Sequence, residues 1–431
     1  MIKRSLFVLT FSVLLLTIGI AQDSGKTGWS FGGIPAVAYD TDTGFLYGAI
    51  LNFYDYGDGS LYPGYGKSVY LEWTRTTKGS DKKVAFLDFK NVLNKGYRVT
   101  VDLSYLTEKA LDFYGFNGYE VEYNSLLTDD ADDNSLYATR VYYKHARELL
   151  RTTVDVQNKL PLNNARWFAG IGSYGTTIGT VDVESLNEGN DENPLPDSVN
   201  TLYDIYVDEG WIDSDEKEGG RTNLVKAGIV YDTRDNEPNP MKGMWSEAMF
   251  LFASSESGAY SQYVLTHRQY FTLKDKSLSL AYRVGMQGKL SGDIPFYMLP
   301  YVHSTYKTTD GWGGSKTLRG ILRNRVVGDG VAYGNIELRW KFARFTLANQ
   351  NFYLALNSFI DGGKVYQRYE YSTSSVIDLL VVREDDTFHI GYGGGFRVAI
   401  NENFIIAVDY GMAKDEQDGS SGLYIGLGYL F

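Results

Sequence analysis

The chain has 431 residues, a net charge of −12, 15% aromatic residues and no cysteine. Its acidity argues against nucleic-acid partners, because phosphate binding requires clustered Lys and Arg. A mean hydropathy of −0.26 is too low for a helical membrane protein, and beyond the N-terminus no run approaches the roughly 18 to 20 apolar residues that a membrane helix needs. Without cysteine, the fold must rely on backbone hydrogen bonding rather than on disulfides.

The N-terminus has the pattern of a secretion signal. Lys3 and Arg4 precede an apolar stretch that ends at Ala21, a small residue of the kind that a signal peptidase requires. We therefore expect residues 1–21 to be a cleaved signal peptide, with a membrane anchor as the alternative. Residues 22–431 are expected to form a single domain outside the cytoplasm.

Alternation of polar and apolar residues, which is typical of β-strands, begins near Ile34. We expect seven strands between about residue 33 and about residue 176. Nine more strands are expected to start near residues 223, 244, 262, 277, 331, 352, 388, 404 and 423.

Two acidic segments lie between expected strands. Residues 129–133 contain four aspartates, and residues 181–220 contain Asp191, Glu192, Asp213, Asp215, Glu216 and Glu218. Such stretches predict solvated loops, and long loops of a membrane barrel lie on its outer side. A cation site is the alternative for residues 129–133, but their spacing lacks the Gly and the distal Glu of a calcium loop.

The runs 277–290 and 335–342 indicate what the two faces of the strands contact. In the second run one parity carries Asn335, Glu337, Arg339 and Lys341, and the other carries Ile336, Leu338, Trp340 and Phe342. Charges cannot point into an apolar core, so the polar parity must face a wet lumen and the apolar parity must face lipid. Because strands that face lipid can leave no edge unpaired, the chain is expected to be an all-β, transmembrane antiparallel β-barrel.

The aromatic content and the last strand fit this class. The 35 Tyr, 22 Phe and 7 Trp exceed what an ordinary surface holds, and outer-membrane barrels carry such residues in girdles at both membrane interfaces. A final apolar parity is expected to run to the last residue: Leu423, Ile425, Leu427, Tyr429 and Phe431. Ending on Phe resembles the signal by which outer-membrane barrels are recognised for insertion, with an ordinary terminal strand as the alternative.

Residues 314–330 end a loop, and each of the next two strands carries one lone carboxylate, Glu337 and Asp361. Arg319 on that loop presents a planar fork of donors that two carboxylates at one depth of the lumen would satisfy. We therefore expect Arg319 to hold the loop inside the barrel, with a solvated loop arginine as the alternative. Three further charged residues of the loop are expected to extend this network: Arg323, Arg325 and Asp329.

Short motifs follow one another over most of the chain. They are Ile34-Pro35, Gly228-Ile-Val-Tyr-Asp-Thr-Arg-Asp235, Pro240-Met-Lys-Gly243, Leu318-Arg319-Gly320, Phe359-Ile-Asp-Gly-Gly363 and Gly393-Gly-Gly-Phe-Arg397. In this order and spacing the chain resembles the barrel of the BamA and TamA superfamily of outer-membrane assembly and translocation proteins, also called bacterial surface antigen barrels. The resemblance implies sixteen antiparallel strands and a loop folded into the lumen from the outer side. It also implies a loop latch in which Arg319 and Gly320 meet the acidic partners Glu337 and Asp361.

The sequence departs from this family pattern at its start. Members that insert or translocate proteins usually carry periplasmic POTRA domains before the barrel, whereas alternation here begins near Ile34. The expectation is therefore a barrel that works without such domains. Asp232, Arg234 and Asp235, which precede a proline-containing turn, are expected to pair structurally.

Catalysis is not expected. The four histidines, His145, His267, His303 and His389, are scattered, so a barrel hydrolase has no local Ser–His pattern. The glycines around Ser173 are misplaced for a nucleophile elbow. No cofactor fingerprint and no metal-ligand pattern is present, so neither a cofactor nor a metal is predicted.

Three functions remain open. The first is insertion or transport of a protein client at the bacterial outer membrane, by parting the first and last strands, where Gly426 and Gly428 would weaken the pairing. The second is a passive, porin-like solute channel, and the third is a structural or surface-interaction barrel that acts through its acidic loops. Expected partners are outer-membrane lipid and lipopolysaccharide, together with a protein client or a periplasmic partner.

Overall fold

The computed structural model describes residues 25–40, 44–131, 134–189, 194–371 and 386–431. One antiparallel sheet contains β1 Trp29–Asp40, β2 Gly44–Asp55, β3 Lys67–Thr76, β4 Asp81–Val92, β5 Tyr97–Asp112, β6 Lys144–Lys159, β7 Ala165–Gly179, β8 Gly219–Asp232, β9 Gly243–Ser255, β10 Gly258–Lys274, β11 Leu278–Ser291, β14 Gly330–Leu347, β15 Gln350–Gln367, β16 His389–Ile400, β17 Phe404–Ala413 and β18 Ser421–Leu427. The predicted signal peptide and its cleavage site lie outside the described residues.

Shorter elements lie between these strands. They are the helices α1 Val183–Asn187 and α2 Leu202–Asp208, the two-stranded sheet of β12 Tyr301–Val302 and β13 Thr309–Asp310, and the 3-10 turns Gly118–Glu120, Ser125–Leu127, Phe296–Met298, Gly314–Lys316 and Glu416–Asp418. None of the helices in the described part of the chain is long and apolar enough to cross a membrane.

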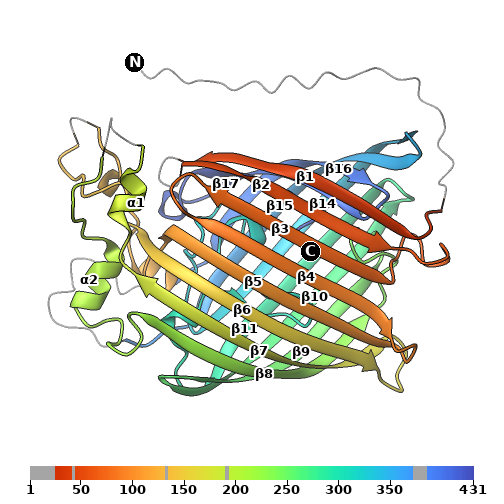
Figure 1. Ribbon diagram of the computed structural model, residues 1–431, viewed down its shortest axis with the longest axis horizontal. Helices are drawn as coiled ribbons and strands as arrows, with labels where there is room; N and C mark the ends of the chain where they lie inside the picture. The colour runs from red at the N-terminus through yellow and green to blue at the C-terminus, as the bar shows by residue number, and fades with distance from the viewer. Residues whose placement is uncertain (1–24, 41–43, 132–133, 190–193, 372–385) are drawn as a thin grey trace.

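The sixteen strands follow one another around the sheet in chain order, from β1 to β18. They curve into a β-barrel, in which the strands are tilted and β1 and β2 come back beside β16 and β17 (Figure 1). This confirms the predicted fold class and strand number. The last nine strands begin at residues 219, 243, 258, 278, 330, 350, 389, 404 and 421, close to the predicted positions.

The two ends of the barrel differ in the length of their connections. At one end the strands are joined by short turns, such as residues 160–164, 275–277 and 401–403. At the other end lie the described parts of the long segments 113–143, 180–218, 292–329 and 368–388, the second of which carries α1 and α2 on the left of Figure 1. Outer-membrane barrels have short periplasmic turns and long outer loops, so the short-turn end is periplasmic.

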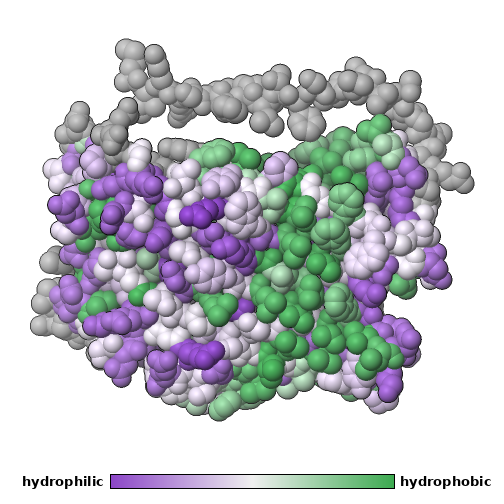
Figure 2. Space-filling view, in the orientation of Figure 1, coloured by the Kyte–Doolittle hydropathy of each residue, from purple (hydrophilic) through white to green (hydrophobic). Residues whose placement is uncertain are grey.

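Apolar side chains face lipid as the alternation predicted, but the surroundings of the inward-facing polar side chains differ from the prediction. Ile336 and Trp340 on β14 are 53% and 51% exposed, and on the face of the barrel that Figure 2 shows, apolar side chains form a band in the half away from α1 and α2. Glu337 and Arg339 on the opposite parity are 0% and 1% exposed. The polar parity therefore lines a lumen packed with protein, whereas the sequence predicted a wet one.

Many of the aromatic residues lie in an outer cap rather than in membrane girdles. Phe116, Tyr206 and Trp211 belong to one large buried cluster that also contains the lumen residue Trp312. The segment 181–220, predicted to be a solvated loop, is therefore partly a packed element. Its acidic residues divide accordingly: Asp213, Asp215 and Glu218 are exposed, Glu216 is buried, and Asp191 and Glu192 lie outside the described residues, as do Asp132 and Asp133 of the other acidic segment.

The last strand ends earlier than predicted. β18 stops at Leu427, and Gly428 takes a left-handed conformation with φ of +87° that glycine adopts without strain. Leu423 and Ile425 face lipid as expected, but Phe431 is buried against Tyr270 inside the barrel. Residues 429–431 therefore turn into the lumen after Gly428, whose left-handed conformation changes the direction of the chain.

Candidate functional site

The segment 292–329, here called the lumen loop, fills the barrel from the outer side. Its residues Trp312, Leu318 and Ile321 belong to the buried outer cluster. Deeper in the lumen, Thr305 donates from its backbone N–H and its hydroxyl to Glu247 Oε2 on β9, both over 2.7 Å. The loop thus contacts the wall with apolar packing near the outside and with hydrogen bonds further in.

Arg319 meets the two carboxylates that the sequence singled out. Its Nε and Nη2 donate to the Asp361 carboxylate over 2.8 and 3.1 Å, and its backbone N–H donates to the same group over 3.0 Å. Its Nη1 lies 2.7 Å from Glu337 Oε1. The guanidinium also stacks 3.6 Å from the centre of the Phe359 ring. Three contacts to one carboxylate and one to another make this a directional anchor.

Burial by itself lowers the pKa of the Arg319 guanidinium, but the nearby Glu337 and Asp361 carboxylates outweigh it, so the net pKa lies above its ordinary value. Arg319 is therefore charged at every physiological pH. Whether this geometry acts as a latch in function stays a prediction.

Sequence reasoning missed half of the charge cluster. Asp409 on β17 lies 3.2 Å from Arg319 Nη1 and accepts two hydrogen bonds of 2.8 Å from Arg397 on β16. Arg339 on β14 donates to Glu337 over 2.7 Å. Three arginines and three carboxylates thus balance each other inside the lumen, which offsets the desolvation of each charge. The alternation placed Asp409, Arg397 and Arg339 on inward-facing parities, and this was the signal that could have identified them.

Close backbone packing, as well as charge, holds the lumen loop against the wall. Gly320 has φ of +93°, and a Cβ there would lie 2.5 Å from the Met412 carbonyl oxygen on β17. At Gly411 a Cβ would lie 2.7 Å from the Gly320 nitrogen, and at Gly391 it would overlap the Arg319 carbonyl oxygen. Loop backbone and wall backbone therefore touch directly, which only glycine permits.

A hydroxyl on the last strand makes a further contact with the lumen loop. Tyr424 of β18 accepts the Gly320 backbone N–H over 3.0 Å. Replacing it (Tyr424→Phe) is expected to leave that N–H without its partner and to lower the free energy of unfolding by about 1–3 kcal/mol. Urea unfolding of the refolded barrel, with Tyr410→Phe on the lipid-facing side of β17 as the control, measures the difference. Equal midpoints for the two variants would show that this contact does not hold the loop.

The other three charged residues predicted for the network lie in separate clusters. Arg323 pairs with Glu108 at 2.9 Å and Asp310 at 3.3 Å. Arg325 donates to the backbone carbonyls of Gln417 and Gly118 over 2.8 and 2.9 Å, and Asp329 pairs with Lys289. These contacts tie the lumen loop to β5, to outer segments and to β11, rather than to the Arg319 cluster.

Tyr429 and Phe431 contact Arg339, a member of the charge cluster. Arg339 Nη2 donates to the Phe431 main-chain oxygen over 2.8 Å, and its guanidinium lies 4.3 Å from the centre of the Tyr429 ring. The inward turn of residues 428–431 therefore adds two contacts to Arg339. Nothing in the alternation of the last strand indicated this contact.

One histidine has partners that the sequence did not reveal. His389 at the outer end of β16 lies between Asp386 and Asp418, with nitrogen–oxygen distances of 3.0 and 2.5 Å, and stacks on Tyr119. This contact joins three outer segments and is structural. Among the described residues no group of three or more His, Asp or Glu is arranged to hold a metal ion.

The barrel, its inserted loop and the Arg319 cluster define a class of outer-membrane protein. Residues 62–431 match the Omp85 superfamily domain, and the chain belongs to the Omp85 superfamily. This confirms the resemblance inferred from the motifs. Barrels of this superfamily reside in the bacterial outer membrane, where they serve assembly and translocation and are not enzymes.

Solved structures show the same fold. BamA from Haemophilus ducreyi lacking POTRA domains 1-3 is 13% identical, with a TM-score of 0.50, and the match covers 94% of this chain and 70% of that one. CdiB from Escherichia coli is 10% identical, with a TM-score of 0.51, and the match covers 92% of this chain and 61% of that one. The comparison with curated proteins gave no significant match.

Proposed function

We propose that this barrel inserts or transports a protein client by parting the seam between β1 and β18. The observation that carries the proposal is the state of that seam: among the described residues no backbone ladder joins β1 to β18. Every other neighbouring pair of strands in the sheet is hydrogen-bonded. An edge without a ladder can separate, and it can pair with an incoming strand, at much lower cost than the rest of the wall.

Side chains bridge this seam on the inside. A Cβ at Gly32 on β1 would overlap the ring of Phe404 on β17. Ile34 on β1 and Leu427 on β18 pack against the same buried cluster as Phe404. An apolar contact of this kind keeps the barrel closed, and because it has no directional bonds it can break and re-form as a unit.

The periplasmic end adds polar contacts across the seam. Tyr54 at the end of β2 donates to the Asn403 carbonyl oxygen over 3.1 Å. The Asn403 amide donates to the Tyr56 hydroxyl over 3.0 Å and to the Pro63 carbonyl oxygen over 2.7 Å. The β2–β3 and β16–β17 turns therefore contact each other past β1 and β18, which are not paired with each other, and this contact supports a seam that opens from the outer side.

A disulfide across the seam is expected to block client handling. The positions of Gly32 and Phe404 suit the variant Gly32→Cys/Phe404→Cys, because a Cβ added at Gly32 would lie 2.3 Å from Phe404 Cγ, the atom bonded to the Phe404 Cβ, and a disulfide needs its two Cβ atoms about 3.5–4.5 Å apart. The chain has no other cysteine. A photocrosslinking residue at lipid-exposed Leu423 on β18 is expected to capture proteins in cells when the disulfide is reduced, and to lose them when it is oxidised.

Two controls make this result specific. The pair Leu71→Cys/Ala85→Cys joins β3 and β4, which are already hydrogen-bonded opposite each other, and its oxidation should leave capture unchanged. A crosslinker at exposed Ile229 on β8 reports proteins that merely lie against the barrel wall. Capture that persists in the oxidised seam variant, or that is equal at Leu423 and Ile229, would contradict a seam mechanism.

The packing of the lumen weighs against a passive solute channel. Arg319 and Trp312 of the lumen loop are each only 1% exposed. The charged side chains of the wall around them are paired. A small or flickering conductance in a planar bilayer is the corresponding expectation, and a large steady one would favour the channel.

A further inference from the structure

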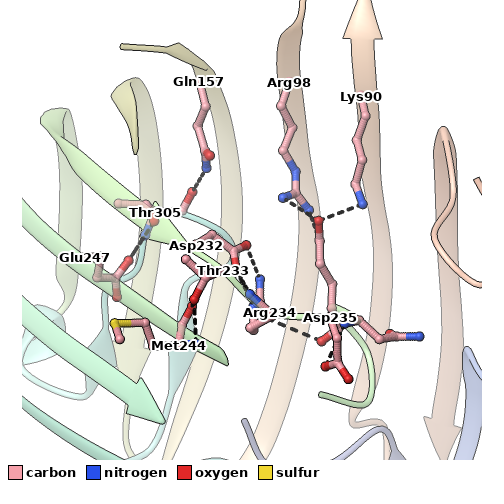
Figure 3. A network of polar contacts seen from close by, with 12 residues as sticks. Lys90, Arg98, Gln157, Asp232, Thr233, Arg234, Asp235, Met244, Glu247 and Thr305 are labelled. Carbon is pink, nitrogen blue, oxygen red and sulfur yellow. Dashed lines mark hydrogen bonds and ion pairs between the residues drawn. The ribbon is translucent and has the colours of Figure 1, made fainter. Parts of the chain in front are cut away.

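The β8–β9 turn, residues 233–242, lies at the periplasmic end and is here called the floor turn. Its Glu237 lies 2.8 Å from Lys90 Nζ on β4 and 2.8 Å from Arg98 Nη2 on β5. Lys90 and Arg98 point from neighbouring strands toward the turn that carries Arg234 and Asp235 (Figure 3). Since β6 and β7 separate β5 from β8 in the sheet, these ion pairs span the inside of the barrel rather than following the wall.

The floor turn is internally braced, so that Glu237 is held out into the lumen. Asp235 Oδ1 accepts the backbone N–H groups of Asn236 and Met241, each over 3.0 Å. Arg234 donates to both oxygens of Asp232 over 2.9 and 2.8 Å. The structural pairing expected of Asp232, Arg234 and Asp235 is thus present, and these hydrogen bonds make the floor turn rigid.

The same turn reaches a second part of the wall. Asn239 donates to Glu402 on the β16–β17 turn over 3.3 Å. In the sixteen-stranded order, β16 and β17 lie six strands away from β8 and β9. The floor turn therefore touches the wall at β4 and β5 and again at the β16–β17 turn, which places it across the periplasmic mouth.

Arg98 joins the floor turn to the lumen loop. Its guanidinium lies 4.9 Å from the centre of the ring of Tyr306, which follows the deep contact of Thr305 with Glu247. Gln157 on β6 also donates to the Thr305 carbonyl oxygen over 2.9 Å, beside the floor turn (Figure 3). The tip of the lumen loop and the floor turn thus meet at one depth in the barrel.

We propose that the floor turn is a periplasmic gate, held shut by the ion pairs of Glu237 with Lys90 and Arg98. The protein then has two barriers in series, the lumen loop from the outside and the floor turn from the periplasm. The gate narrows the periplasmic mouth without sealing it, so it slows small polar solutes and hinders the segment of a client that enters from that side.

The ion pairs are built so that the gate can open. Glu237 and Lys90 have side chains that are 25% and 20% exposed, whereas Arg98 is 6% exposed. When Glu237 leaves, Arg98 keeps its two hydrogen bonds of 2.8 and 2.7 Å to buried Asp88. Opening of the gate therefore leaves no buried charge of the wall without a partner. The ion pairs that break are partly solvated, so salt screens them.

Labelling of a lumen thiol tests the gate directly. Ser304 lies in the lumen loop tip and is buried, and Ser304→Cys introduces a single thiol into a chain that has none. The probe is a charged methanethiosulfonate reagent added to the refolded full-length barrel. Adding Glu237→Gln is expected to raise the labelling rate about ten-fold, the size expected from losing two partly exposed ion pairs.

The matched control is Asp275→Asn, which removes an exposed carboxylate from the β10–β11 turn at the same end. It should leave the labelling rate unchanged. Raising the salt concentration should speed labelling of the parent Ser304→Cys variant and have little effect once Glu237→Gln is present. Heat resistance on a gel, measured for each variant, separates opening of the turn from loss of the fold.

Equal labelling rates with and without Glu237→Gln, in barrels of equal heat resistance, would overturn the gate. If Glu237→Gln weakens the fold, the lock Lys90→Cys/Glu237→Cys, joined by a short bismaleimide, replaces it. Conductance across a bilayer should then fall on crosslinking in a background where Arg319→Ala has removed the outer barrier, and unchanged conductance would overturn the gate. Neither measurement involves a client, so its outcome is independent of the seam proposal.

Discussion

Replacing Arg319 with alanine (Arg319→Ala) is expected to release the lumen loop and to raise the single-channel conductance of the refolded barrel. The change removes the two side-chain hydrogen bonds to Asp361 and the ion pairs with Glu337 and Asp409. Breaking a buried pair by removing one partner leaves an uncompensated charge, at a cost of about 3–5 kcal/mol. The loop at residue 319 then keeps only its backbone N–H bond to Asp361 on β15, and heat resistance on a gel should fall.

Two other variants define what Arg319 contributes. Arg323→Ala removes a more exposed arginine from the same loop, with a 34% exposed side chain, and should cost no more than about 1 kcal/mol. Arg319→Lys keeps the charge but lacks the planar fork, so it should restore only part of the closure. A conductance and heat resistance that are the same in Arg319→Ala and Arg323→Ala would contradict the latch.

Replacing Gly391 with alanine (Gly391→Ala) is expected to open the barrel by shape alone. A Cβ at this position would overlap the Arg319 carbonyl oxygen, which is backbone and cannot rotate away. Forcing extra volume into a packed contact costs about 1–3 kcal/mol or more. All three arginines and all three carboxylates of the cluster remain, so any rise in conductance reports displacement of the loop from its seat and not a loss of charge.

The control for this variant lies close by. Gly362→Ala on β15 would place its Cβ 3.4 Å from the His389 carbonyl oxygen, an ordinary contact distance, and should leave conductance unchanged. Combining Gly391→Ala with Arg319→Ala should add little, because both act on one contact. Fully additive effects on conductance and on unfolding midpoints would mean that the two changes disturb independent features.

The latch and the seam are physically connected. Gly320 of the lumen loop donates to Tyr424 on β18, the strand that borders the seam. Asp409 on β17 pairs with Arg319, and its neighbour in the sheet is β18. Release of the loop therefore loosens the last two strands as well, so conductance and seam opening are expected to change together in Arg319→Ala.

Local patterns in the sequence were sufficient for the wall of the barrel. A period of two along each strand decides which side chains face lipid, and it needs no knowledge of distant residues. The same pattern placed Glu337 and Asp361 as lone inward charges on neighbouring strands, so their meeting with Arg319 followed from strand order. The strand number and the inserted loop followed from the motifs that the family shares.

Contacts across the lumen were decided by the tertiary structure. Asp409 joins Arg319, and Glu237 joins Lys90, over sequence separations that no local periodicity encodes. The inward turn after Gly428 and the burial of Glu216 depend on which surfaces happen to face them when the barrel closes. Alternation reports on which face of a strand a residue lies, whereas the partner of an inward charge depends on curvature and on what fills the lumen, and these arise only when all sixteen strands are in place.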